Sequence, residues 1–229
     1  MEASVQTTRI LGIDFYNDSL ERALEIARDE GGLFLAPSGP GLSELGKNTC
    51  YDTALQHADI NLIDSGYLAL LWKKRTGKSL QRHSGLKFIK ALIDTPAFKK
   101  NSRQLWVVPN HEHQVATTNY LGSQDIDLGE QHFYQAPFYE GFPIEDSQLL
   151  NTIREQRPDY VILTIAGGKQ EVLGHWLRDK LDYEPSIICI GAAIAFLSGK
   201  QVTIPAWADR IYIGWLLRIL ANPKEFLPR

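Results

Sequence analysis

The sequence has little cysteine and no long apolar run. Its two cysteines, Cys50 and Cys189, lie far apart, so free thiols in a reducing, cytosolic setting are a better interpretation than a disulfide framework. No segment stays apolar over the roughly 18 residues that a membrane span requires. The N-terminal stretch MEASVQTTRI also lacks the apolar centre of a signal peptide. We therefore expect a protein that is soluble or peripheral to a membrane.

Several motifs of common enzyme classes are missing as well. The chain has no GxGxxG, no Walker A, no GxSxG and no paired CxxC motif. These absences argue against a dinucleotide dehydrogenase, a phosphate-loop ATPase, a serine hydrolase and a zinc protein. The formal net charge of −3 gives no general reason to expect binding to nucleic acid.

What the sequence does contain is a repeated alternation of strand and helix patterns. This alternation predicts an α/β, Rossmann-like fold with a mainly parallel sheet and helices on both faces. We expect one domain over residues 1–205 and a C-terminal amphipathic helix in an appendage over residues 206–229. The predicted strands cover residues 9–15, 33–36, 58–63, 104–108, 131–136 and 160–165, with a last one just before Gly191. The predicted helices cover residues 20–29, 51–57, 67–74, 86–93, 111–121, 145–156 and 206–222, with another beginning near Lys169, and residues 37–41 and 196–205 are predicted loops.

Residues 158–205 are typical of a βαβ unit. The buried strand 160–165 leads to Gly167 and Gly168, where glycine allows a sharp turn and lets a ligand approach the backbone closely. The helix that follows exposes N–H groups at residues 169–171, and the positive end of its dipole favours an anion such as a diphosphate. The alternative is that the two glycines only form a tight βα turn.

Two charged side chains earlier in the chain are candidates for binding or catalysis. Asp64 follows the predicted strand 58–63, so it should lie at the carboxyl end of the sheet, where a carboxylate can meet a ligand. Alternatively, it caps the helix 67–74. Arg82 has the geometry to bind a phosphate or a carboxylate with two parallel hydrogen bonds. Alternatively, it forms a surface or interdomain ion pair.

The pair His111 and His113 suggests a metal site at first sight. A spacing of two residues points the two side chains to different faces of a helix. Solvent-exposed histidines at a helix start are the better interpretation, and we expect no metal site.

The predicted terminal helix carries one strongly apolar face. Four apolar residues recur on it at a spacing of four: Trp207, Ile211, Trp215 and Ile219. Together with Arg210 and Arg218, this face suits the surface of an anionic membrane. The alternative is that the helix packs on its own domain or on another subunit, which leaves a homo-oligomer open.

Several short motifs follow one another along the chain. They are Asp64, Arg82 with Gly85, Arg157-Pro158-Asp159, Gly168-Lys169-Gln170-Glu171, the stretch from Gly191 to Lys200, and Trp215 with Arg218. In this order they resemble the WecG/TagA/CpsF glycosyltransferases, glycosyltransferase family 26. Gly168 to Glu171 is similar to the Pro-Lys-Gln-Glu signature of that family, with Gly168 in place of proline.

The resemblance implies an inverting enzyme of cell-surface or exopolysaccharide synthesis that uses neither a metal nor a cofactor. Such enzymes move an N-acetylhexosamine or a hexose from a UDP-sugar to a lipid-linked acceptor at the cytoplasmic membrane face. Asp64 would be the base that takes the proton from the acceptor hydroxyl. Arg82 or Arg218 would neutralise the leaving diphosphate. The residues that would bind substrate are Ser38, Arg82, Gly85, Gly167, Gly168, Lys169, Gln170, Glu171 and Arg218.

The chain also departs from the family pattern. The Thr-Pro-Asn loop of the family is Ala36-Pro37-Ser38 here, so two polar side chains near the predicted site are lost or shortened. Ala195 stands where many members carry an aspartate, and Gly214 replaces a glutamate. These changes fit a different donor or acceptor, or lost catalysis. The alternative function is therefore a non-catalytic paralogue that binds or scaffolds a partner enzyme.

Overall fold

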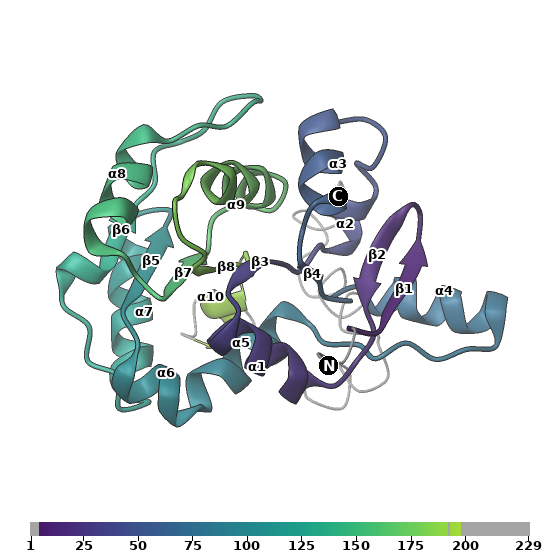
Figure 1. The fold of residues 1–229 in the computed structure, drawn as a ribbon, viewed down its shortest axis with the longest axis horizontal. Helices are drawn as coiled ribbons and strands as arrows, with labels where there is room; N and C mark the ends of the chain where they lie inside the picture. Colours follow the sequence, from purple (N-terminus) through teal and green to yellow (C-terminus); the bar gives the residue numbers. More distant parts are fainter. Residues whose placement is uncertain (1–4, 192, 198–229) are drawn as a thin grey trace.

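The computed structural model describes residues 5–191 and 193–197, and its centre is a six-stranded, all-parallel sheet (Figure 1). The strand order is β4-β3-β8-β7-β5-β6. The strands are β3 (Gly32–Leu35), β4 (Ile60–Asn61), β5 (Gln104–Val108), β6 (Phe133–Gln135), β7 (Tyr160–Leu163) and β8 (Ser186–Cys189). Every residue of β3, β5, β7 and β8 is buried, as expected for parallel strands that are covered on both faces. The predicted Rossmann-like fold is confirmed.

Helices cover both faces of this sheet (Figure 1). One face packs against α3 (Thr49–Gln56), α8 (Ser147–Gln156) and α9 (Lys169–Lys180). The other face packs against α1 (Leu20–Asp29), α5 (Gly85–Asp94), α6 (Pro96–Asn101), α7 (His111–Gly122) and α10 (Ala193–Leu197). Successive residues of a strand point to opposite faces of the sheet, so each face has its own hydrophobic core. Leu33 and Leu35 face the first group of helices, and Phe34 faces the second.

The helices begin where the sequence supplies short polar caps. Ser19 caps α1, Asn48 caps α3, Ser84 caps α5, Asn110 caps α7 and Asp146 caps α8, each through a side-chain oxygen that accepts a backbone N–H. The helix α4 (Gly66–Thr76) is capped by Ser65 and ends at Gly77, which adopts a left-handed conformation. Local sequence therefore determines most helix boundaries.

The first predicted strand is wrong in one respect, because residues 9–15 are part of a hairpin. The antiparallel strands β1 (Thr7–Ile10) and β2 (Ile13–Tyr16) are joined by a two-residue turn at Leu11 and Gly12. Both turn residues have positive φ, 53° and 84°, as in a type I′ turn, whose twist matches that of the strands. The hairpin is a separate two-stranded sheet that contacts β4, and Asn61 Nδ2 donates a hydrogen bond to the Asp14 carbonyl.

Two predicted loops contain short helices, and one strand is shorter than predicted. Residues 37–41 were expected to be a loop, but Ser38 caps the four-residue helix α2 (Gly39–Leu42), because proline is tolerated in a first helical turn. The helix α10 extends into the predicted loop 196–205. Only two residues of the predicted strand 58–63 pair with β3. A short 3₁₀ helix, Glu130–His132, replaces the start of the predicted strand 131–136.

The predicted terminal helix 206–222, with Gly214 and Arg218, lies outside the described residues. Within residues 5–191 and 193–197, no helix combines the length and the hydrophobicity that crossing a bilayer requires.

Candidate functional site

Four strand ends meet at the carboxyl edge of the sheet, where parallel α/β sheets bind their ligands. Hydrogen bonds continue from strand to strand just past the strand ends. The Ala36 N–H donates to the Cys189 carbonyl at 3.3 Å, and the Ile190 N–H donates to the Leu163 carbonyl at 3.2 Å. The Leu62 N–H donates to the Leu35 carbonyl at 2.7 Å. The segments that follow β3, β4, β7 and β8 are therefore held together at this edge.

Asp64 reaches the start of α5 from the segment after β4. Its Oδ1 atom accepts the Gly85 N–H at 3.0 Å, and its carbonyl accepts Nε–H of Arg82 at 3.0 Å. Ser65, whose Oγ accepts the Leu68 N–H, caps α4, so the alternative that Asp64 caps this helix is wrong. Asp64 and Arg82 are both partly exposed. The structure therefore brings Asp64, Arg82 and Gly85 together, as the motif resemblance implied.

Gly85 is buried and serves close packing. A Cβ atom at this position would lie 3.1 Å from Cβ of Ala36 and 3.6 Å from Cγ2 of Ile190. The first turn of α5 thus lies directly against the ends of β3 and β8. Its N–H is bound by Asp64, so Gly85 positions the catalytic candidate.

Ser38 follows β3, the strand that pairs with β4, after which Asp64 comes. Its Oγ accepts the Gly41 N–H at 3.3 Å, and its side chain is exposed. A Cβ atom on the adjacent Gly39 would lie 3.4 Å from Oγ of Ser65. The loop after β3 and the loop after β4 are therefore in contact.

The glycine turn after β7 is open to solvent. Gly167 is exposed, and a Cβ atom at Gly167 or Gly168 would meet no atom of the described residues within 4 Å. Gly168 has φ +84°, a conformation that proline cannot adopt, because its ring fixes φ near −65°. This turn therefore differs from one built on the Pro-Lys-Gln-Glu signature. It leaves the N-terminus of α9 beside an open surface.

Gln170 and Glu171, which follow this turn, are buried with only 2% of their surface exposed. Gln170 Oε1 accepts the Gly191 N–H at 2.6 Å, and its Nε2 donates to Glu171 Oε1 at 3.2 Å. Glu171 Oε2 accepts the Gly168 N–H at 2.6 Å. Burial raises the pKa of Glu171, and the hydrogen bonds from Gln170 and Gly168 oppose that rise. Sequence reasoning did not foresee this burial.

Lys169 extends away from this pair toward the loop that precedes α8. Its Nζ donates to the Gly141 carbonyl at 2.7 Å and lies 4.1 Å from the centre of the Phe142 ring. The same loop is anchored by Asp146, which accepts the Tyr139 hydroxyl at 2.6 Å. Lys169 thus joins this loop to the first turn of α9.

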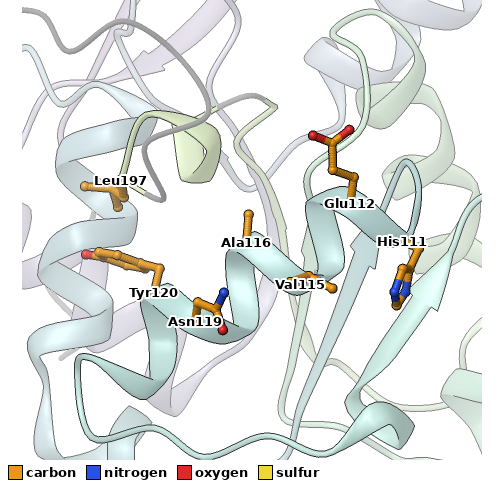
Figure 2. A pocket seen from close by; sticks show the side chains of 7 residues that line it. All are labelled: His111, Glu112, Val115, Ala116, Asn119, Tyr120 and Leu197. Atoms are coloured by element: carbon orange, nitrogen blue, oxygen red, sulfur yellow. The ribbon is translucent and has the colours of Figure 1, made fainter.

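A hollow lies along α7 and beside α10 (Figure 2). It measures about 600 Å³ and is lined by His111, Glu112, Val115, Ala116, Asn119, Tyr120 and Leu197. A second hollow of about 360 Å³ lies between α7, β6 and α8. Among the described residues, no predicted substrate-binding residue lines either hollow, whereas His111, one of the two histidines that the sequence analysis considered, lines both.

Two further sequence predictions concern a metal site and Arg218. In the described part of the chain, no three His, Cys, Asp or Glu side chains are grouped so that they could hold a metal ion. Arg218, the other predicted partner of the diphosphate, lies outside the described residues.

An all-parallel sheet with strand-end loops gathered at its carboxyl edge defines a Rossmann-like α/β protein whose ligand site is expected at that edge. The profile of the Glycosyl transferase WecG/TagA/CpsF family matches residues 8–229, nearly the whole chain, and the chain belongs to this family. Its family role is therefore that of a glycosyltransferase. A comparison with curated proteins finds no match.

Proposed function

We propose that the chain is an inverting, metal-independent glycosyltransferase that moves an N-acetylhexosamine or a hexose from a UDP-sugar to a lipid-linked acceptor. Family membership supports sugar transfer, and the motif resemblance supports the finer assignment. The observation that carries the proposal is the position of Asp64 at the carboxyl edge, bonded to Gly85 and beside Arg82.

In the proposed reaction, Asp64 takes the proton from the acceptor hydroxyl while that oxygen attacks the anomeric carbon. The bond from the anomeric carbon to the diphosphate oxygen breaks, and UDP leaves with the electron pair. The positive dipole end of α9, the open turn Gly167-Gly168 and Arg82 are the features proposed to stabilise the diphosphate. Arg218 is a further candidate.

A thermal-shift screen of nucleotides and UDP-sugars tests this proposal. At a UDP concentration 100 times its dissociation constant, binding stabilises the folded state by about 2.7 kcal/mol. In a chain of this size that corresponds to a rise in melting temperature of about 5–10 °C. CMP and GDP are the matched controls, and the UDP-sugar with the largest shift is then assayed for transfer. Equal shifts with all nucleotides, or none with any, would contradict the proposal.

The second candidate function is a non-catalytic subunit that binds or scaffolds a partner enzyme. Ala195, buried in α10 at 4% exposure, and the loop Ala36-Pro37-Ser38 favour it, because the family pattern has polar side chains there. This candidate predicts that the chain neither hydrolyses nor transfers from any UDP-sugar and that it co-purifies stably with another transferase.

Contact with the cytoplasmic membrane surface is a further part of the proposal, based on Trp207, Trp215 and their neighbouring arginines. We expect the chain to float with liposomes that contain anionic lipid and not with neutral ones. Replacing Arg210 and Arg218 with Gln should reduce flotation, whereas replacing the exposed Arg9 with Gln is the matched control. Equal flotation of both variants would contradict this contact.

A further inference from the structure

Two backbone turns at the carboxyl edge are joined by one buried side-chain pair. Gly168 lies in the turn after β7, and Gly191 lies in the turn after β8. The Gly168 N–H donates to Glu171, Gln170 donates to the same carboxylate, and the Gly191 N–H donates to Gln170. These three hydrogen bonds form an uninterrupted chain from one turn to the other, and we call this hydrogen-bonded connection the clamp.

We propose that Gln170 and Glu171 are positioning residues, which hold the two turns at the spacing that the donor nucleotide requires. This inference rests on the proposed function for the identity of the ligand. It differs from the assignment that the motif resemblance implied, in which both side chains line the donor pocket. The exposed backbone of the first turn, at Ala166 and Gly167, then contacts the nucleotide, and the buried pair fixes where that backbone lies relative to the second turn.

The burial and the hydrogen bonding of Gln170 and Glu171 support a positioning role for these side chains. Both side chains are 2% exposed, whereas Gly167 in the adjacent turn is exposed. Within the described part of the chain, no ion pair to Glu171 is formed, so its acceptor atoms are matched by N–H donors alone. A buried carboxylate without a cation is costly, so its hydrogen bonds must be well made. The thiol of Cys189 on β8 adds a fourth link, since it donates to the Gln170 carbonyl at 3.3 Å.

Both turns also contain a glycine with positive φ. Gly168 has φ +84° and Gly191 has φ +54°. A Cβ atom at Gly191 would lie 3.4 Å from Nε2 of Gln170, so this side chain packs directly against the second turn. The pair thus determines the geometry of both turns through hydrogen bonds and through packing.

The order of donors and acceptors provides a sharp test. In Glu171→Gln, one of the three hydrogen bonds must be lost, because whichever way the two amides turn, two donors face each other. In Gln170→Glu, two carboxylates face each other at neutral pH. The double variant Q170E/E171Q restores every partner. The new carboxylate accepts the Gly191 N–H and the new amide donor, and the new amide oxygen accepts the Gly168 N–H.

Amide hydrogen exchange of the ligand-free protein measures the hydrogen bonds directly. We expect each single variant to raise the exchange rate of at least one of the Gly168 and Gly191 amides about tenfold to hundredfold relative to the amides of β7, as loss of a buried hydrogen bond does. The double variant should return both rates to near the wild-type values. Unchanged exchange in both single variants, or no recovery in the double variant, would overturn the clamp.

UDP binding on the same variants separates positioning from direct contact. If the pair positions the turns, UDP affinity falls in both single variants and recovers in the double variant together with exchange. Recovery of exchange without recovery of UDP affinity would overturn the positioning role, because it would place the side chains themselves on the nucleotide. If a single variant does not fold, folding of the double variant alone supports the clamp, and failure of all three contradicts it. Absence of UDP binding to the wild-type protein would refute the proposed function, while the exchange data would still decide the clamp.

Discussion

The position of Asp64 makes its observed structural role compatible with its proposed catalytic role. Its Oδ1 atom accepts the Gly85 N–H and so fixes the start of α5 against the sheet edge. Its carboxylate is only partly buried, as a base that meets an acceptor hydroxyl must be. Gly85 allows the close approach of α5 to β3, because a Cβ atom at this position would lie 3.1 Å from Cβ of Ala36, tighter than an ordinary contact.

This geometry makes Asp64→Asn a clean test of the base. The asparagine Oδ1 still accepts the Gly85 N–H, so the fold and the UDP thermal shift should persist. The variant has lost its basic oxygen, and we expect the transfer rate to fall by about 10²–10⁴-fold. Rates are measured with the UDP-sugar that gives the largest thermal shift. Asp182→Asn, which changes a carboxylate exposed at 70%, is the control. Normal turnover of the Asp64 variant would show that another group is the base.

At the scale of secondary-structure elements, the hairpin turn carries an unfavourable residue. Leu11 has φ +53° and is 68% exposed, and a left-handed conformation costs a leucine about 1–2 kcal/mol. Asparagine tolerates this conformation, and Asn-Gly is the preferred pair for a type I′ turn. Leu11→Asn should therefore raise the free energy of unfolding by about 1 kcal/mol, as measured by urea denaturation.

Leu11→Val is the matched control for this turn. A β-branched side chain is least compatible with positive φ, so this variant should be less stable than the wild-type protein. If both substitutions destabilise, the exposed leucine contributes contacts that outweigh the backbone cost.

The elements that the sequence predicted correctly are those with strong local patterns. The predicted helix 20–29 and strand 104–108 match α1 and β5 residue for residue, because a Ser cap and a β-branched run mark them. The hairpin was missed because Leu11-Gly12 interrupts an apolar run without the usual Asn or Asp. The helices α2 and α10 were missed because segments of four or five residues carry too little periodicity.

At the scale of the whole molecule, strand order depends on contacts that no local pattern records. The strand β3 pairs with β8, which lies at the other end of the described chain, and Leu35 is the register partner of Cys189. That pairing is what places the Asp64 and Gly191 segments at one edge. The motif resemblance anticipated the grouping of Asp64, Arg82 and Gly85. The burial of Gln170 and Glu171 was not foreseen, because polar residues in a first helical turn are more often exposed.

A histidine in the interior predicts how the stability of the whole fold depends on pH. His83 is 4% exposed, its Nε2 donates to the Asp18 carbonyl at 2.7 Å, and its buried Nδ1 has no hydrogen-bond partner among the described residues. Burial lowers the pKa of His83 below its usual 6.5, and the charge of Lys87 lowers it further, while Asp18 and Glu21 oppose the shift. Protonation would place an unpaired N–H and a charge in the core.

The sign follows from linkage. Between pH 6.5 and the lowered pKa of His83, the unfolded chain binds a proton at this ring that the folded protein does not bind. The stability that the neutral ring contributes is therefore lost progressively as the pH falls from 6.5 to the lowered pKa. Glu171, with its raised pKa, acts in the opposite direction, but it is present in every variant and cancels in a comparison. The free energy of unfolding in urea should therefore fall less between pH 8 and pH 5.5 in His83→Gln than in the wild-type protein, by up to about 1.4 kcal/mol, because pH 5.5 lies one unit below the usual histidine pKa of 6.5. His111→Gln, which removes an exposed ring, is the control. An identical pH dependence in His83→Gln and the wild-type protein would mean that His83 takes up its proton in the folded state at the same pH as in the unfolded chain.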